Sequence, residues 1–341
     1  MRLTLALTVA VVHANAIGWG EQPKLGDTHL GEVAVDGFFV VSGFLVTRSA
    51  LRLGSSRRYA WHRALRIMPG FWVCLLVVAF VAAPLIAWLQ GRPPGSVLTG
   101  EQSSVGYVVR NAALMIRQWD IGGLLGAGGT DEGAMNGALW TLWYEALCYV
   151  AVAVLVALVP RRRHTVVVAA TVVAMWVVVL LQTLRLAGGP EFLPRFLLAF
   201  GLGALGWLAA DRIRFTPVYV ILAAVTFGAG SALLPDYRVA GSAGLAYLLL
   251  WAIVALPVRI EPPADLSYGL YVYHWPVQQV LLAAGATALG LPGFVVLAVA
   301  VTALLSLASW HWVEAPALSA KNAAWVSVPL AVPRRIRALL G

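Results

Sequence analysis

Ten long apolar stretches divide this sequence, and they constrain its fold more than any other feature. A helix needs about 20 mostly apolar residues to cross the hydrocarbon core of a membrane. The stretches are 3–20, 33–51, 67–89, 137–159, 165–187, 195–210, 216–234, 239–257, 268–286 and 292–313. Hydrophobic residues make up 60% of the chain and charged residues 11%, against about 45–50% and about 25% in soluble domains. The sequence therefore predicts an all-α polytopic membrane protein with about ten transmembrane helices, and it excludes a soluble, disordered or disulfide-stabilised chain.

The basic residues indicate how the chain is oriented. If the N-terminus lies inside, 17 of the 24 lysines and arginines fall in cytoplasmic segments, as the positive-inside rule requires. We therefore expect both termini in the cytoplasm, a membrane domain over 1–320 and a basic cytoplasmic tail over 321–341. The long connection 90–136 is expected outside, with a short helix near 105–117, and to cover the outer entrance.

His13 is an ionisable residue in the middle of the first stretch, where such residues are costly and point to function. Arg2 precedes it by 11 residues, about 16 Å along a helix and about 20° around it, so both lie on one face. An arginine at the mouth can hold an anion while a neutral imidazole takes a proton deeper inside. The alternative is a packed histidine hydrogen-bonded to a neighbouring helix. A secretory signal cleaved after Ala14–Ala16 would remove His13, and we favour the uncleaved helix.

Glu145 lies about two turns into the fourth stretch, where a carboxylate must be protonated, paired or hydrated. Pairing with His13 would orient the imidazole and raise its basicity, as in a general-base dyad. A structural pair with a histidine or arginine is the alternative. Arg63 and Arg66 lie three residues apart before the third stretch, so on a helix they would share one face and could bind phosphates together. Without further evidence, positive-inside anchoring is the simpler explanation.

Other polar residues also fall in the apolar stretches. Asp36 is expected near the outer surface, and Ser42 can bond across helices within a glycine-containing segment that suits close packing. His311 and Glu314 are expected to form a structural pair at the inner end of the last stretch. Motifs such as HExxH, CxxC and a phosphate loop are absent from the sequence, so no bound metal or cofactor is expected.

The ninth stretch is the most polar of the ten. Ser267, Tyr271 and His274 are spaced so that they share one helix face. Pro276 follows them and is expected to break the helix. This face is therefore a candidate part of an intramembrane site.

Taken in order, these segments resemble motifs of the bacterial membrane acyltransferase-3 family over nearly the whole chain. Arg2 with His13 resembles its arginine–x10–histidine element, and Arg63 with Arg66 resembles its RxxR element. The other matching segments are Asp36–Phe44, Leu139–Glu145, Leu266–Pro276 and Trp312–Pro316. Each segment is weak alone, but six in the correct order are specific. In two departures, family members usually carry several residues before the first arginine, and many have a second Glu where Ala146 stands.

The resemblance implies transfer of an acyl group, usually acetyl, from cytoplasmic acyl-CoA to a hydroxyl of a glycan, glycolipid or secondary metabolite. It implies that His13 is the catalytic group, that Glu145 is its partner, and that Arg2, Arg63 and Arg66 bind the donor. The residues expected to support the site are Asp36, Ser42, Trp140, Tyr271 and His274. Acyl-CoA would be a co-substrate, the bacterial plasma (inner) membrane the location, and nucleic acid no partner.

Two mechanisms and a second function remain open. His13 could deprotonate the acceptor hydroxyl for direct attack on the thioester, or it could take the acyl group first and hand it on. The alternative function is a proton-coupled permease or flippase for a glycolipid or metabolite, with His13 and Glu145 as a proton relay. The sequence shows no paired broken helices of the transporter kind, which argues against transport.

Overall fold

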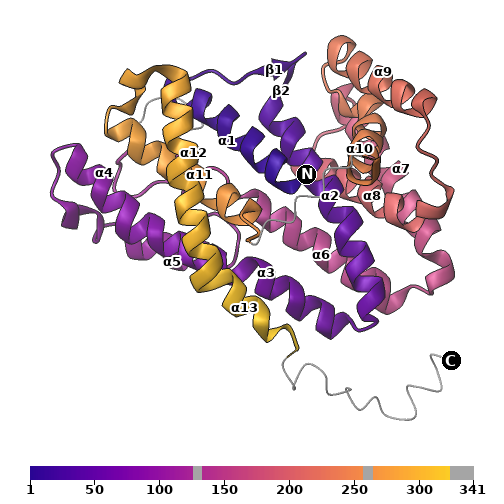
Figure 1. Ribbon diagram of the computed structural model, residues 1–341, viewed down its shortest axis with the longest axis horizontal. Helices are drawn as coiled ribbons and strands as arrows, with labels where there is room; N and C mark the ends of the chain where they lie inside the picture. The colour runs from indigo at the N-terminus through magenta and orange to yellow at the C-terminus, as the bar shows by residue number, and fades with distance from the viewer. Residues whose placement is uncertain (126–132, 256–263, 323–341) are drawn as a thin grey trace.

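The computed structural model describes residues 1–125, 133–255 and 264–322, and its regular structure is almost entirely helical (Figure 1). The α-helices are α1 (Arg2–Trp19), α2 (Leu30–Leu53), α3 (Ser56–Val77), α4 (Ala83–Leu89), α5 (Ser104–Asn111), α6 (Thr141–Leu158), α7 (His164–Thr183), α8 (Phe192–Leu208), α9 (Pro217–Leu233), α10 (Arg238–Ala255), α11 (Ser267–Ala283), α12 (Gly290–Ser309) and α13 (Ala315–Ser319). Two-residue strands β1 (Lys24–Leu25) and β2 (Thr28–His29) form an antiparallel hairpin between α1 and α2. π-Helical turns at Val78–Ala82 and Trp310–Glu314 join α3 to α4 and α12 to α13. Short 3₁₀ turns lie at Pro94–Val97, Arg161–Arg163, Ala210–Arg212, Ala286–Leu289 and Ala320–Asn322.

The helices confirm an all-α polytopic membrane protein. Within the described ranges, seven helical segments are long and apolar enough to cross a membrane, and α8 and α9 are shorter apolar helices. Each of the ten apolar stretches overlaps one of these segments or α11, and the third corresponds to the continuous run from α3 to α4. The end of the stretch 239–257 and residues 323–341 of the predicted tail lie outside the described residues. The number of crossings, the side on which the termini lie and the boundary of the membrane domain stay predictions.

α2 and α11 lie in the interior of the bundle, and α1 packs against both. Every residue of α11 from 267 to 279 is buried, whereas most of α7 is not. Figure 1 shows α7 to α10 grouped on one side of the molecule and α4 and α5 on the other. The burial of α11 explains its polar composition, because an interior helix can satisfy polar side chains that a lipid-facing helix could not.

α11 continues past Pro276 to Ala283, so the expected helix break is wrong. A proline inside a helix has no N–H to donate to the carbonyl four residues earlier, which here belongs to Val272. Asn136 supplies the missing donor from its Nδ2 at 2.8 Å, and the Cys74 thiol donates to the same oxygen at 3.2 Å. Neighbouring segments therefore satisfy the carbonyl that the proline frees, and the helix runs on.

α2 and α8 approach each other through glycines. A Cβ atom on Gly43 of α2 would overlap the carbonyl oxygen of Phe200, and one on Gly203 of α8 would overlap the carbonyl oxygen of Val40. The two backbones therefore touch without intervening side chains, as in close helix pairs in membranes. This contact confirms the packing role expected for the glycine-containing segment of α2.

The connection 90–136 contains the expected short helix, but α5 ends at Asn111, earlier than predicted. The Asn111 side-chain oxygen accepts hydrogen bonds from the backbone N–H groups of Arg117 and Gln118. Its Nδ2 donates to the Gln118 carbonyl at 2.8 Å. One buried asparagine therefore turns the chain where a helix would otherwise have continued. Residues 126–132 of this connection are outside the described ranges.

Candidate active site

His13 pairs with a second histidine. Its Nδ1 lies 2.9 Å from Nε2 of His274, and the two rings are nearly parallel, with an interplanar angle of 12°. Trp275 packs edge-on against the His13 ring with centroids 4.8 Å apart. α1 supplies the first histidine and α11 supplies the two residues that hold it, so the contact between these helices fixes the ring.

The hydrogen bonds of this pair determine where its protons lie. His274 Nδ1 is 3.1 Å from the Leu270 carbonyl oxygen, which can only accept, so Nδ1 carries the proton and Nε2 is an acceptor. His13 Nδ1 must then donate to His274, and Nε2 of a neutral His13 is left without a proton. This Nε2 lies on the side of Gly31, at the start of α2. It has no hydrogen-bond partner among the described residues, so the arrangement provides a general base with a fixed tautomer.

Glu145 does not pair with His13, so that prediction is wrong. Its Oε1 accepts hydrogen bonds from Ser42 of α2 at 3.1 Å and from Tyr149, one turn later on α6, at 2.6 Å. The cross-helix bond expected of Ser42 is therefore confirmed. Sequence reasoning missed Tyr149, although its position four residues after Glu145 places both on one helix face.

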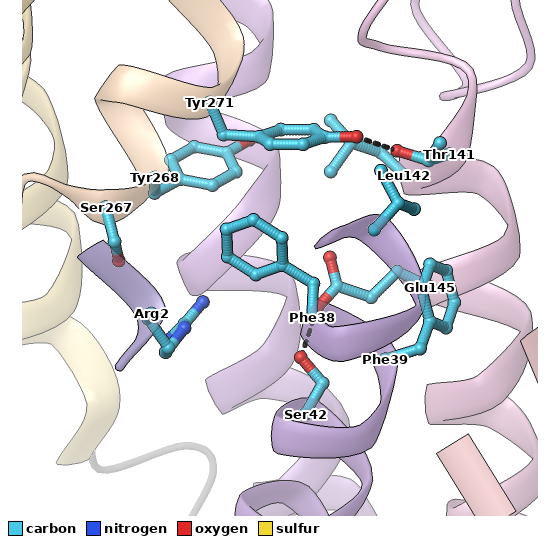
Figure 2. A pocket seen from close by; sticks show the side chains of 11 residues that line it. Arg2, Phe38, Phe39, Ser42, Thr141, Leu142, Glu145, Ser267, Tyr268 and Tyr271 are labelled. Carbon is cyan, nitrogen blue, oxygen red and sulfur yellow. Dashed lines mark hydrogen bonds between the residues drawn. The ribbon is translucent and has the colours of Figure 1, made fainter. Parts of the chain in front are cut away.

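Two cavities approach each other within the bundle. The larger, about 920 Å³, has His13 on its wall, and the connection 90–136 contributes Met115, Trp119 and Ala134. The connection therefore lines this cavity, and its role as a cover of the outer entrance stays a prediction. The smaller cavity, about 30 Å³, is lined by Arg2, Ser42 and Glu145 (Figure 2).

Three residues line both cavities. They are Val35 of α2, Thr141 at the start of α6 and Tyr271 of α11. The Tyr271 and Thr141 hydroxyls are 2.5 Å apart, and Phe38 packs edge-on against the Tyr271 ring at 5.4 Å between centroids. Figure 2 shows the tyrosine and threonine across the top of the small cavity, with Phe38 directly below. We call Val35, Thr141 and Tyr271 the septum.

The arginines expected to bind a donor gather at the Arg2 end of α1. Arg66 is 2.6 Å from Asp265 and 3.5 Å from Glu314, and Arg2 is 4.0 Å from the same Asp265. Arg63 lies over the ring of Tyr149 at 5.7 Å and has no ion pair in the part of the chain that the structure describes. The three arginines are therefore brought near one another; Arg2 and Arg66 share Asp265, and Arg66 alone also pairs with Glu314.

Asp265 was not foreseen as part of this arginine group. Burial opposes its ionisation, but the Arg66 and Arg2 guanidinium groups and hydrogen bonds from Ser267 outweigh that effect and hold its pKa below the ordinary value. Asp265 is therefore an anion at neutral pH. It occupies positive charge that an anionic ligand could otherwise use.

The expected pair of His311 and Glu314 does not form. His311 Nδ1 bonds to the Leu307 carbonyl oxygen at 2.8 Å, whereas Glu314 turns inward to Arg66 and accepts from Ser309 at 3.1 Å. The π-helical turn at Trp310–Glu314 adds a residue to the helix and rotates the later side chains, so spacing counted on a regular α-helix gave the wrong pair.

Asp36 is buried, with 2% of its surface exposed, and its position near the outer surface of the membrane stays a prediction. Its carboxylate accepts hydrogen bonds from Arg195 Nε at 2.7 Å, Arg238 Nε at 2.6 Å and Tyr237 Oη at 2.7 Å. Glu32, one turn earlier on α2, binds the same two arginines at 2.8 Å each. This cluster ties α2, α8 and α10 together. Only the one-turn spacing of the two carboxylates was visible in the sequence.

Trp140 lies on the wall of the large cavity within an aromatic group. Its ring contacts Tyr144, Phe192 and Phe196 with centroids between 4.5 and 5.7 Å apart. Trp119, Trp143 and Trp275 add further aromatic surface to the same wall. Seven of the 21 residues that line the cavity are therefore Trp, Tyr or Phe, and His13 lies on the same wall.

Comparison with known proteins identifies the family. A family model described as an acyltransferase domain matches residues 1–311 of the chain. The chain belongs to this acyltransferase-3 family. The match confirms the resemblance seen in the sequence motifs, and it supports membrane O-acyl transfer as the activity of this acyltransferase.

Two relatives resemble the acyltransferase over most of their length. An O-acetyl transferase of Shigella phage Sf6 is 27% identical over 330 residues, covering 92% of this chain and 93% of the relative. Nodulation protein 10 of Rhizobium leguminosarum bv. viciae is 28% identical over 324 residues, covering 84% and 82%. No solved structure gives a significant match to the acyltransferase.

Proposed function

We propose that this protein transfers an acyl group, with acetyl as the expected group, from acyl-CoA to a hydroxyl of a glycan or glycolipid at a bacterial plasma (inner) membrane. The observation that carries the proposal is the environment of His13. Its Nδ1 is occupied by His274, and its Nε2 is free of hydrogen-bond partners among the described residues, beside a cavity of about 920 Å³. A base in this state is ready to accept the proton of an incoming hydroxyl.

The donor enters at the Arg2 end. Arg2, Arg63 and Arg66 form a positively charged group that suits the phosphates of CoA, since guanidinium groups bind phosphate through paired hydrogen bonds. His13 lies about 16 Å further along α1. An extended pantetheine arm spans a comparable length, so a donor held by its phosphates can present its thioester near the histidine.

The acceptor binds in the large cavity. Its aromatic wall, including Trp119, Trp140 and Trp275, offers flat apolar surfaces on which the faces of sugar rings can pack. The relative from phage Sf6 carries the name O-acetyl transferase, which fits a hydroxyl acceptor. Glu32 and Arg195 on the same wall add polar groups that can orient the sugar.

In the proposed reaction the acceptor hydroxyl attacks the thioester carbonyl carbon while His13 Nε2 takes its proton. The C–S bond then breaks, the acceptor oxygen keeps the acyl group as an ester, and His13 returns the proton to the CoA thiolate. His274 accepts the Nδ1 hydrogen bond throughout and keeps the ring aligned. Direct transfer requires both substrates to be bound together and predicts sequential kinetics. An acyl-His13 intermediate would instead give ping-pong kinetics.

The test is acetyl-CoA turnover by the purified full-length protein in detergent. We expect slow CoA release by the wild type and its loss in His13→Ala, with retained CoA binding. His311→Ala is the matched control, because His311 bonds only to the carbonyl of the preceding helical turn. Equal release by wild type and His13→Ala would refute the role of His13. Absence of CoA binding together with proton-gradient-dependent solute uptake would favour the permease instead.

A further inference from the structure

The two cavities meet at a boundary of three side chains. The small cavity carries the donor-side groups Arg2 and Glu145, and the large cavity carries His13. The shared lining is the septum of Val35, Thr141 and Tyr271, which come from α2, α6 and α11. The two cavities therefore adjoin at these residues.

Two of the three shared residues are joined by a hydrogen bond between their side chains. Thr141 Oγ1 donates to the Ala138 carbonyl at 3.2 Å, so the Tyr271 hydroxyl is the donor in the 2.5 Å bond between the two hydroxyls. Both residues are buried. Phe38 packs edge-on against Tyr271 and supports its ring from the small-cavity side (Figure 2). The tyrosine is the long member of the pair, so rotation of its side chain would open the boundary.

We propose that the Tyr271–Thr141 hydrogen bond is the specificity-determining closure of the reaction path, which keeps water from the large cavity away from the donor until the acyl group passes through. The inference rests on the proposed acyl transfer, because it takes the donor to lie on the Arg2 side and the base to lie on the other. With the septum closed, His13 and a thioester that approaches from the Arg2 side stay apart. With it open and no acceptor present, water can take the place of the acceptor hydroxyl.

The competing reaction defines the measurement. A water oxygen attacks the thioester carbonyl, His13 accepts its proton, the C–S bond breaks, and CoA thiol leaves with a free carboxylic acid as the second product. Weakening the septum therefore raises CoA release without acceptor. The loss of one neutral hydrogen bond predicts a rise of about two- to tenfold.

The experiment measures acceptor-free CoA release from acetyl-CoA by the full-length protein. Tyr271→Phe and Thr141→Val each remove one hydroxyl with little change in shape, and Thr141→Ser keeps the hydroxyl as the matched control. We expect faster release in the first two variants and wild-type release in the third. Adding His13→Ala to Tyr271→Phe should abolish the gain. If CoA release is unchanged in both hydroxyl-deleting variants but still depends on His13 in the wild type, the proposed closure by the septum is refuted. The proposed acyl transfer is not affected by that result.

A second readout does not depend on acyl transfer. The protein is reconstituted into vesicles of phosphatidylethanolamine and phosphatidylglycerol that contain a pH-sensitive dye, and decay of an imposed pH gradient is followed. Because the septum separates the two cavities, Tyr271→Ala should accelerate the decay, whereas Thr141→Ser should match the wild type. If Tyr271→Ala accelerates the decay of the pH gradient but the wild type releases no CoA from acetyl-CoA, the proposed donor is refuted and the closure by the septum is supported. Decay at the wild-type rate in correctly folded Tyr271→Ala would count against the closure.

Discussion

Replacement of His274 by leucine tests the proposed base through a residue that does not itself face the substrate. The substitution removes the acceptor of the His13 Nδ1 hydrogen bond, 2.9 Å long, and leaves the imidazole free to hold its proton on either nitrogen. When the proton of a neutral imidazole sits on Nε2, that nitrogen cannot accept the proton of a hydroxyl. The variant should therefore lose activity although His13 is still present.

The size of this loss in activity follows from the interactions that the substitution removes. The hydrogen bond alone, between neutral groups, is worth about 0.5–1.5 kcal/mol, or about two- to tenfold. General-base catalysis as a whole contributes about 10²–10⁴-fold. His274→Leu combines the lost bond with a wrong tautomer, so a loss on the order of 10²-fold in kcat is expected, with little change in KM for acyl-CoA. His274→Gln should recover much of it, because an amide oxygen can accept from His13 Nδ1.

The assay is pre-steady-state CoA release from acetyl-CoA across a range of pH, with His311→Leu as the control for loss of an imidazole elsewhere. A purely structural role for His274 would lower the amount of folded protein and leave the rate per folded molecule and its pH profile unchanged. Wild-type kcat in folded His274→Leu would refute the tautomer argument. So would equal activity losses in the leucine and glutamine variants.

Three further outcomes follow from the buried polar contacts. Arg63→Ala should raise KM for acyl-CoA with no loss of thermal stability in detergent, because Arg63 has no ion pair among the described residues. Arg66→Ala should lower thermal stability, because the buried carboxylate of Glu314 loses its arginine. Asp36→Asn should destabilise the protein by about 3–5 kcal/mol, measured as thermal unfolding, since two buried arginines lose their carboxylate. Asn136→Leu should cost about 0.5–1.5 kcal/mol in the same measurement, because the buried Val272 carbonyl loses its amide donor and keeps only the Cys74 thiol. Wild-type unfolding of Asp36→Asn or Asn136→Leu would contradict the corresponding argument.

The helical architecture could be predicted because it depends on local hydropathy. All ten apolar stretches overlap helices, since a run of apolar residues in a membrane has to satisfy its own backbone hydrogen bonds. The predicted break at Pro276 failed for a non-local reason. The donor that rescues the freed carbonyl is Asn136, distant in the sequence, and no pattern around the proline indicates it.

The residues of the candidate site could be predicted better than their partners. His13, Glu145, Tyr271 and His274 were all singled out, yet the expected bond from His13 to Glu145 is replaced by one to His274. Helix periodicity fixes which face a residue occupies but not how two helices are turned relative to each other. The π-helical turn before Glu314 adds a second source of error, because it changes the periodicity itself.

The choice of partner has a physical rationale in a membrane interior. A buried histidine–carboxylate dyad places a charge in a medium of low dielectric constant whenever the carboxylate is ionised, and that charge needs a cation or several hydrogen bonds to offset its desolvation. The intramembrane carboxylates of this protein already have such partners: arginines for Asp36, and two hydroxyls for Glu145. A pair of neutral imidazoles needs none, and it still fixes the tautomer of His13 through one hydrogen bond. A carboxylate at position 274 would therefore strengthen the hydrogen bond but add a buried charge. We expect His274→Asp to unfold at a lower temperature than His274→Gln, and the reverse order would contradict this account.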